Sequence, residues 1–336
     1  MRVKNREEKK KVNPVRAALR ILGGLLAALF LFLLVMYVIP LTETGDSSAV
    51  SGTADWMAEL DDSLLLNEIT LPGTHDSGTQ YVQLGYFAKC QAKSIGGQLE
   101  AGYRYLDIRL AVDGDGMKLM HGFTNCRSGV MPWASALSLD EVLEQCYAFL
   151  KAHPTETVVF AVKQEHGEES VSEFETLLNS YVQREPSFWL ESDQIPALGE
   201  ARGKLVLMRR YEDEAGLGAA AGIPLLWENQ KGFADLSLNT VAVDNGSYTL
   251  WVQDRYEYDT EEKWAAFCAG MEKAELGEGT VALHFLSTKG SATYGHPYRY
   301  AKALNERLLG RQDLSGWIVV DFASAKNAEH IYKANF

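Results

Sequence analysis

The sequence predicts an α/β barrel that follows a single N-terminal transmembrane helix. Three observations support this fold class: an uncharged apolar run near the N-terminus, an alternation of β-rich runs with helical patterns, and polar side chains directly after those runs. The chain has 336 residues, of which 46% are hydrophobic and 23% charged, so collagen-like, low-complexity and largely disordered proteins are excluded. The length after the apolar run suits one barrel.

The apolar run covers residues 21–39 and contains no charged side chain. Its length is close to the roughly 20 residues that a helix needs to cross a bilayer. Eight Lys and Arg residues lie within residues 1–20, and the positive-inside rule places such a basic segment in the cytoplasm. We therefore expect a single-pass cell-membrane protein with its larger part extracellular. The alternative is secretion after cleavage of a signal peptide, whose apolar region is normally shorter, at roughly 7–15 residues.

Charge and composition divide the chain into four segments. Residues 1–20 form a basic cytoplasmic tail, residues 21–39 the transmembrane anchor, residues 40–62 a small-residue, acidic stretch typical of a flexible tether, and residues 63–336 the barrel. The net charge is −13 overall, but −19 beyond residue 40. This acidic charge argues against nucleic acid as a partner. We expect the barrel to be a monomer.

Eight short runs carry the residue types of strands, and several are continuously apolar, as buried parallel strands are. They are Leu66–Leu71, Tyr103–Ile108, Met117–Met120, Thr157–Val162, Lys204–Met208, Tyr248–Val252, Val281–Leu286 and Trp317–Val320. Helical patterns lie between several of these runs. One helix is predicted to begin after Ser138, which forms a capping-box pattern with Glu141, and another near Pro297. The alternation predicts a (β/α) barrel.

Polar side chains follow seven of the eight runs. They are His75 and Asp76, Arg109, His121, Lys163, Arg209 and Arg210, Asp254 and Tyr256, and Asp321. In a barrel the carboxyl ends of the strands meet at one mouth, where active sites lie. Two histidines, several carboxylates and several cations at one mouth indicate an acid–base site for an anionic substrate.

Seven segments, in order, resemble the bacterial branch of the phosphatidylinositol-specific phospholipase C family. They are ITLPGTHDSGT (69–79), RYLDIRL (104–110), the pair His121-Gly122, ETVVFAVKQE (156–165), ARGKLVLMRRY (201–211), WVQDRYEY (251–258) and GWIVVDF (316–322). The resemblance extends from about residue 60 to the C-terminus. It implies an irregular, incompletely closed TIM barrel and an active enzyme.

The resemblance also implies a role for each matched residue. His75 matches the general base, Asp321 the carboxylate that orients it, His121 the general acid, Asp76 the acidic residue that assists it, and Arg109 the cation that faces the phosphate. Lys163, Arg210, Asp254 and Tyr256 match the inositol-binding residues, with the Tyr256 ring under the apolar face of inositol. Arg209 is also basic, and Arg210 is preferred because it directly precedes Tyr211.

The implied reaction is cleavage of phosphatidylinositol in a membrane to diacylglycerol and inositol 1,2-cyclic phosphate, which makes the enzyme a lyase. Arg109 stands where calcium-dependent relatives have acidic ligands, so we expect no metal and no cofactor. Two alternatives remain open. The same chemistry could act on glycosylphosphatidylinositol or lyso-inositides, or the chain could be an inactive, membrane-anchored module that binds inositides.

Overall fold

A computed structural model describes residues 13–228, 240–277, 279–291 and 295–336. Its centre is a mostly parallel sheet in the order β6-β7-β5-β2-β1-β12-β11-β10-β9, with β8 paired to β7. The strands β9 and β3 pair antiparallel to β10 and β2, and β4 pairs antiparallel to β3. Among the described residues no pairing joins β6 or β8 to β9, so the barrel is open there. This confirms the predicted irregular, incompletely closed TIM barrel.

The strands are, in chain order, β1 (Leu71–Thr74), β2 (Tyr105–Asp113), β3 (Gly116–His121), β4 (Thr124–Asn125), β5 (Val158–Gln164), β6 (Trp189–Leu190), β7 (Leu205–Arg209), β8 (Ile223–Pro224), β9 (Thr240–Asp244), β10 (Thr249–Gln253), β11 (Thr280–Phe285) and β12 (Trp317–Val320). The first predicted run, Leu66–Leu71, is wrong, because its start forms a 3₁₀ turn and the strand begins only at Leu71. Six of the other seven runs coincide with strands to within two residues, and the run Tyr103–Ile108 falls on β2, which continues five residues further, to Asp113.

The helices pack on the outside of this sheet. The α-helices are α1 (Pro14–Leu33), α2 (Ile39–Thr42), α3 (Gly85–Ala88), α4 (Ile95–Glu100), α5 (Leu139–Ala152), α6 (Val171–Val182), α7 (Leu198–Ala201), α8 (Thr260–Lys273), α9 (Pro297–Leu308) and α10 (Ala325–Tyr332). A π-helical turn η1 (Leu34–Val38) joins α1 to α2, and 3₁₀ turns form η2 (Trp56–Glu59), η3 (Leu66–Glu68), η4 (Pro186–Phe188), η5 (Gly218–Ala221) and η7 (Lys333–Asn335).

The predicted capping box at the start of α5 is present. The Ser138 hydroxyl accepts from the backbone N–H of Glu141, and the Glu141 carboxylate accepts from the Ser138 N–H. Two orphan N–H groups of the first helical turn gain partners from one sequence pattern. The helix that was expected near Pro297 is α9.

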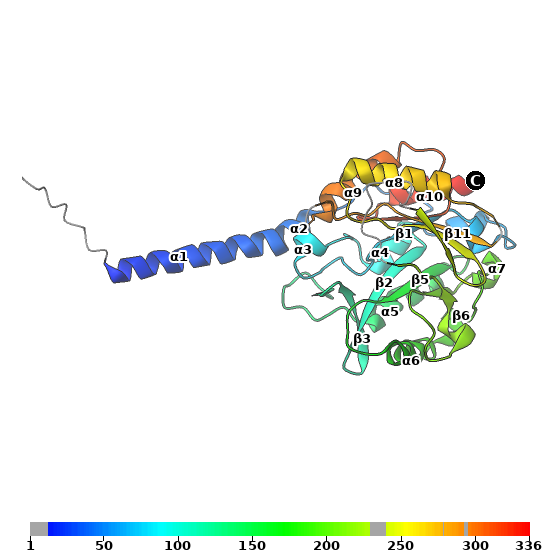
Figure 1. Ribbon diagram of the computed structural model, residues 1–336, viewed down its shortest axis with the longest axis horizontal. Helices are drawn as coiled ribbons and strands as arrows, with labels where there is room; N and C mark the ends of the chain where they lie inside the picture. The colour runs from blue at the N-terminus through cyan, green and yellow to red at the C-terminus, as the bar shows by residue number, and fades with distance from the viewer. Residues whose placement is uncertain (1–12, 229–239, 278, 292–294) are drawn as a thin grey trace, which may run out of the picture.

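Side chains of the parallel strands alternate between two separate apolar clusters. On β2, Tyr105 belongs to the cluster inside the barrel, whereas Leu106 and Ile108 belong to the cluster under α4, α5 and α6. On β7, Val206 and Met208 point inward and their neighbours outward. A third cluster lies beneath α8, α9 and α10, on the opposite side of the sheet region from α5 and α6 (Figure 1). This period of two decides which side chains reach the mouth.

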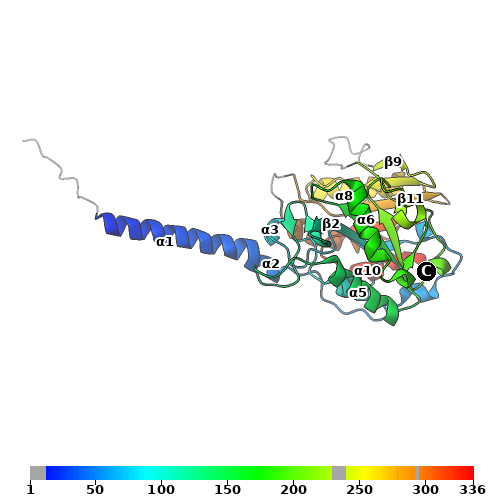
Figure 2. The same cartoon turned by 90° about the horizontal axis from the view of Figure 1, so that it is seen from below.

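The apolar N-terminal run forms a continuous helical segment that is longer than the predicted 21–39. The segment covers Pro14–Thr42 and has the length and composition of a membrane span. Most of it projects away from the barrel as a single rod (Figures 1 and 2). Its last turns instead contact the barrel, where Met36 and Pro40 are buried.

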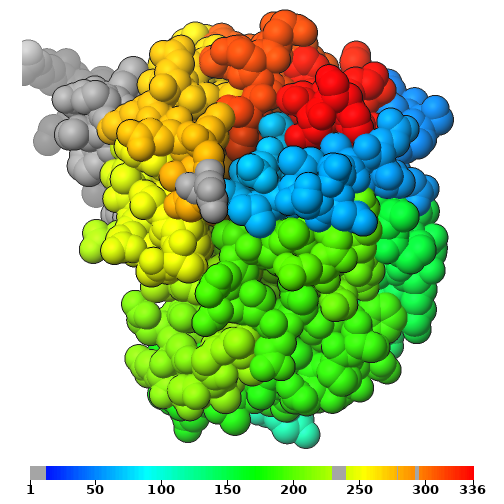
Figure 3. All heavy atoms as spheres, turned by 90° about the vertical axis from the view of Figure 1, so that its right-hand side faces the viewer, coloured from blue at the N-terminus to red at the C-terminus, as the bar shows by residue number. Residues whose placement is uncertain are grey.

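Residues 40–62, predicted as a flexible tether, differ from that prediction by packing along the barrel. Trp56, Met57 and Leu60 join the inner apolar cluster, and the Trp56 ring stacks on Tyr332 at 4.9 Å between ring centroids. Seen from the side opposite α1, this N-terminal segment lies against the C-terminal end of the chain (Figure 3). Three large apolar side chains in an otherwise small and polar segment are enough to dock it.

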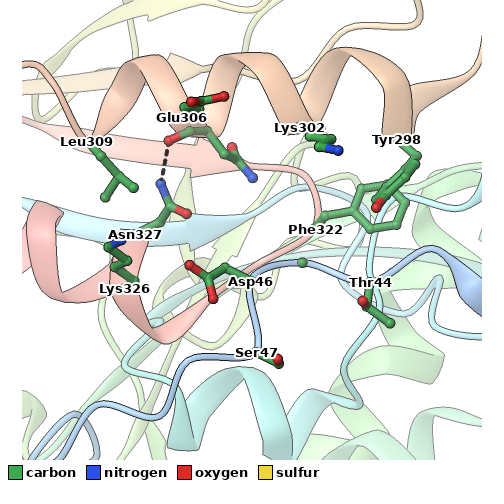
Figure 4. A pocket seen from close by; sticks show the side chains of 12 residues that line it. Thr44, Asp46, Ser47, Tyr298, Lys302, Glu306, Leu309, Phe322, Lys326 and Asn327 are labelled. Carbon is green, nitrogen blue, oxygen red and sulfur yellow. Dashed lines mark hydrogen bonds between the residues drawn. The ribbon is translucent and has the colours of Figure 1, made fainter.

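Two further contacts secure the same segment. The buried Glu156 carboxylate forms an ion pair with Arg104 at 2.8 Å and accepts a hydrogen bond from the backbone N–H of Met57 at 3.1 Å. Residues 44–47 pass beside α9 and α10 and line with them a cavity of about 520 Å³ (Figure 4). The folded barrel unit therefore begins well before residue 63, and the apolar helical segment leads into it without a free linker.

Candidate active site

A cavity of about 370 Å³ lies at the carboxyl ends of the parallel strands. Of the nine residues predicted for the site, eight line this cavity: His75, Arg109, His121, Lys163, Arg210, Asp254, Tyr256 and Asp321. The ninth, Asp76, is 2% exposed and contacts three of the others from below the cavity surface. The structure therefore brings the whole predicted set together.

The alternation of the strands explains this convergence. His75 continues the inward-facing series of β1, which includes Leu71, and Asp321 continues the inward series of Trp317 and Val319 on β12. Arg210 likewise follows Val206 and Met208. Each of these three side chains is therefore the next inward-facing position after the apolar interior of its strand.

The alternation of side chains along β7 also places Arg209 and Arg210 on opposite faces of the strand. Arg210 lines the cavity and its side chain is 5% exposed. Arg209 points to the other side of β7, where its guanidinium donates to the backbone carbonyls of Gly222 and Tyr211. The structure thus places Arg210, and not its neighbour, in the cavity.

His75 and Asp321 are neighbours because of strand register. Thr74 of β1 pairs with Val320 of β12. His75 is the next residue after Thr74, and Asp321 is the next residue after Val320. His75 Nδ1 lies 2.8 Å from Asp321 Oδ1. Burial opposes the charged imidazolium, but the carboxylates of Asp321 and Asp76 outweigh it and raise the pKa of His75 to about 9. With a proton on Nδ1 facing Asp321, Nε2 is the atom that faces the cavity.

Asp76 connects both histidines to Arg109. Its carboxylate lies 3.2 Å from His75 Nε2, 3.5 Å from His121 Nε2 and 3.1 Å from Arg109 Nε. The backbone of Asp76 has a φ of 43°, in the left-handed region that Asp tolerates better than most residues. A hydrogen bond from its N–H to Asp107 Oδ2 at 3.1 Å holds this turn.

His121 reaches the mouth by a route that the sequence did not predict. It ends β3, an antiparallel strand that forms a hairpin with β2, so it is not at the carboxyl end of a barrel strand. The hairpin extends beyond the mouth and β3 returns toward it. His121 Nδ1 lies 2.8 Å from the Ala88 carbonyl, which can only accept a hydrogen bond, so Nδ1 carries a proton. The ring of His121 is 6.3 Å from that of His75 between centroids.

Two buried carboxylates in the site were missed by the sequence reasoning. Asp107 Oδ2 accepts from Arg109 at 3.0 Å, and Glu165 Oε2 accepts from Lys163 Nζ at 2.6 Å. Burial opposes their ionisation, but Arg109 together with Arg210 lowers the pKa of Asp107, and Arg109 together with Lys163 lowers that of Glu165 to about 2. Both are therefore anions that fix the cations of the site. Each lies two positions from a predicted cation on the same strand face, a spacing that could have identified it.

Arg210, Trp227 and Asp254, which we call the Arg210 group, form a looser set. The Arg210 guanidinium lies 3.5 Å from the centroid of the Trp227 ring, and Trp227 Nε1 donates to Asp254 Oδ2 at 3.0 Å. Arg210 is 4.0 Å from Asp254 and 3.7 Å from Asp107, too far for hydrogen bonds. Trp227 was also missed, and it carries no local sequence signal because it lies in a connection between strands.

Among the described residues, one set of side chains has the spacing to hold a metal. Ligand atoms of His75, Asp76 and Cys90 lie within 4.8 Å of one another. Arg109, however, lies 3.0 Å from His75 Nε2 and 3.1 Å from Asp76 Oδ1. A fixed guanidinium at this position repels a metal ion and supplies positive charge itself.

Together, the fold and the cavity define a class: an open α/β barrel with two histidines, supported by buried carboxylates and a guanidinium, at the carboxyl ends of its strands. Residues 73–211 match the model of the phosphatidylinositol-specific phospholipase C X domain. The matched range includes six of the nine predicted site residues: His75, Asp76, Arg109, His121, Lys163 and Arg210.

Relatives match along most of their length. The chain is 29% identical over 291 residues to the 1-phosphatidylinositol phosphodiesterase of Staphylococcus aureus strain Newman, covering 80% of this chain and 88% of that protein. It is 26% identical over 304 residues to the enzyme of the same name from Listeria monocytogenes, covering 84% and 85%. A crystal structure of the S. aureus phospholipase C superposes with a TM-score of 0.68 at 25% identity, covering 83% of this chain and 97% of that one.

Proposed function

We propose that this protein cleaves phosphatidylinositol to diacylglycerol and inositol 1,2-cyclic phosphate without a metal ion, with His75 as general base and His121 as general acid. One observation carries the proposal: two histidine rings, 6.3 Å apart between centroids, share the buried carboxylate of Asp76 in a cavity that also contains Arg109. The relatives named phosphodiesterases support the coarser part, cleavage of a phosphoric diester.

The proton transfers follow from the hydrogen bonds of the two rings. His75 Nε2 takes the proton of the inositol 2-hydroxyl, whose oxygen forms a bond to phosphorus. The bond from phosphorus to the diacylglycerol oxygen breaks, and His121 Nε2 gives its proton to that oxygen. Attack within one molecule needs no bound water and benefits from a high effective concentration. Asp321 keeps the Nδ1 proton of His75 in place and stabilises the imidazolium that forms.

The remaining residues handle charge and orientation. Arg109 balances the negative charge that grows on the non-bridging phosphate oxygens. Asp76 stabilises a protonated His121 from 3.5 Å. Lys163, Arg210 and Asp254 offer donors and acceptors for inositol hydroxyls, and Tyr256 offers an aromatic face to the apolar side of the ring.

The raised pKa of His75 sets the pH dependence of this mechanism. A histidine with a pKa of about 9 is protonated in the empty site at neutral pH, whereas a base must be neutral. We expect kcat/KM to rise with pH until it approaches this value.

We also propose that α1 anchors the enzyme in the cell membrane as a single span, with the N-terminus cytoplasmic and the barrel extracellular. The support is a helical segment of 29 residues, apolar enough to cross a bilayer, near the N-terminus. An intact mass and resistance to alkaline extraction from membranes are expected. A mature protein that begins after residue 39 would instead show secretion after cleavage.

The direct test of the reaction uses the full chain with phosphatidylinositol vesicles in EDTA, followed by phosphorus NMR. We expect a five-membered cyclic phosphodiester signal that a His121→Ala variant does not produce. Release of a glycosylated anchor without turnover of phosphatidylinositol would keep the mechanism and change the substrate. Binding of inositide vesicles without turnover of either lipid would favour the binding module.

A further inference from the structure

Exposed large apolar side chains cluster at one place on the described surface of the barrel. Of the described residues after Thr42, six large apolar side chains are exposed, and four of them lie within eleven positions. These four are Phe123 (73% exposed), Val130 (45%), Met131 (50%) and Trp133 (80%). Single exposed apolar residues are ordinary on soluble proteins, but a cluster marks a surface that meets an apolar partner.

These side chains belong to residues 122–135, which we call the rim loop. The loop is held by its own hydrogen bonds, including one from the Arg127 guanidinium to the Ala134 carbonyl at 2.7 Å and one from the Ser128 N–H to the Ser135 carbonyl at 3.1 Å. Its apolar side chains therefore project from an ordered frame. Gly122, which directly precedes Phe123, lines the active-site cavity.

The rim loop also lies beside the end of the apolar helix. Val130, Met131 and Pro132 share a narrow cleft with Met36 and Leu41. In two perpendicular views the loop region around β4 lies on the side of the barrel from which α1 projects (Figures 1 and 2). A bilayer that contains α1 would therefore meet this surface of the barrel.

The joint between helix and barrel fixes this orientation. Lys89 is 5% exposed, and its ammonium donates to the carbonyls of Pro40 at 2.6 Å and Glu43 at 2.9 Å. Glu43 in turn pairs with His296 at 2.6 Å. The contact is made on α3, where a Cβ on Gly85 would lie 3.0 Å from Pro40, and Phe87 of the same helix lines the cavity. One short helix thus contacts both the anchor and the active site.

We propose that the rim loop is a second membrane contact, which inserts Phe123, Met131 and Trp133 into the interfacial region of the bilayer that contains α1 and holds the cavity mouth against that bilayer. The proposal rests on the proposed membrane anchoring of α1. Trp favours the membrane interface, and Phe is common among the apolar side chains that segments lying in the interface bury. The part of the chain beyond residue 40 carries a charge of −19, so the attraction is apolar and does not need anionic lipid. Anchoring keeps the loop at a high local concentration, so weak insertion suffices.

The test compares two exposed positions on opposite ends of the barrel. Leu276 is 56% exposed and adjoins Gly277, whose carbonyl accepts from Asn67 just before β1, so it lies at the amino ends of the strands. In full-length protein with a Cys268→Ser background, we would introduce Trp133→Cys or Leu276→Cys and attach the same fluorescent label. Each protein is then reconstituted into phosphatidylcholine vesicles with spin-labelled lipid. The remaining cysteines are buried and should not react.

We expect the label at position 133 to be quenched by lipid at least about fivefold more than the label at position 276, with no dependence on salt. Equal quenching at both positions would overturn the proposal. So would quenching at position 133 that appears only with anionic lipid. This readout requires no turnover. If the protein cleaves phosphatidylinositol but both labels are quenched equally, only the membrane contact of the rim loop is contradicted. If the label at position 133 is quenched but no lipid is cleaved, only the proposed reaction is contradicted.

A kinetic arm uses the double variant Phe123→Ser, Trp133→Ser. Burial of two aromatic side chains at the interface is lost, so we expect roughly tenfold slower turnover of vesicle phosphatidylinositol, with unchanged turnover of a short-chain, monomeric phosphatidylinositol. Leu276→Ser, a change at another exposed apolar position, should leave both rates unaltered. Equal losses on both substrates would assign the rim loop to the active site and contradict a membrane role.

Discussion

The two halves of the active-site cavity are built with different tightness. Around the histidines, His75, Asp76, Arg109 and Asp321 make contacts of 2.8–3.2 Å with one another. In the Arg210 group the distances from Arg210 to its carboxylates are 3.7 and 4.0 Å. Within the described part of the chain, Arg210 Nη1 and Asp107 Oδ1 are buried and make no hydrogen bond. The Asp76 oxygens also lack a hydrogen bond there, but they form ion pairs with His75 and Arg109 at 3.2 and 3.1 Å.

The difference indicates a division of labour. Buried polar atoms are nearly always hydrogen-bonded, so the unused capacity around Arg210 is suited to hydroxyls that a substrate brings. The histidines instead have their partners before any substrate arrives, which is the preorganisation that proton transfer and charge stabilisation require. Changes near the histidines should therefore lower kcat, and changes in the Arg210 group should raise KM.

The largest effect is expected for His121→Ala. Loss of the general acid should lower kcat on phosphatidylinositol by about 10²–10⁴-fold. A substrate with a phenolate leaving group needs no proton on departure, so most of the loss should disappear with an inositol aryl phosphate. His75→Ala is the matched control, because removal of the base should slow both substrates alike. Equal losses for His121→Ala on the two substrates would contradict its role as acid.

Asp321→Asn should reduce kcat by roughly 10²-fold and also move the pH profile. The negative charges of Asp321 and Asp76 raise the pKa of His75, so removing one of them lowers that pKa. Because the base must be neutral, the acidic limb of kcat/KM then moves to lower pH. Asp76→Asn should move it in the same direction. A limb that stays in place in both variants would show that it does not report on His75.

Arg210→Met should raise KM by roughly tenfold and leave kcat less affected, since it removes donors that a bound hydroxyl would use. Arg209→Met is the control on the opposite face of β7, where the side chain bonds only to backbone carbonyls among the described residues. It should stay within about twofold of the parent enzyme. A loss confined to kcat would show that the looser half of the cavity takes part in the chemistry itself.

Much of this site could be predicted from the sequence because its residues continue the inward-facing series of buried strands. Asp107 and Glu165 obey the same alternation and could have been found by extending it two positions from Arg109 and Lys163. His121 was identified by its motif, but its position depends on the length of the β2–β3 hairpin. The place of Trp227 in the site depends on long-range contacts with Arg210 and Asp254, so it could not be predicted from the sequence.

The structure of residues 40–62, in contrast to the site, could not be predicted from the sequence. Its small and acidic composition indicates a flexible tether, yet three apolar side chains and one buried ion pair dock it on the barrel. Composition averages over a segment, whereas docking depends on a few side chains and on a complementary surface formed by distant residues. The rim loop and the joint at Lys89 are visible for the same reason only in the structure.

The smallest effect is expected for metal removal. Arg109 lies within 3.1 Å of His75 Nε2 and of Asp76, so the tight half of the cavity already contains its cation. A divalent ion among His75, Asp76 and Cys90 would face this guanidinium at short range. Turnover of phosphatidylinositol should therefore be the same, within error, in EDTA and in millimolar calcium. Activity that EDTA abolishes and calcium restores would mean that Arg109 moves away when substrate binds, and that the tight half of the cavity is not preorganised.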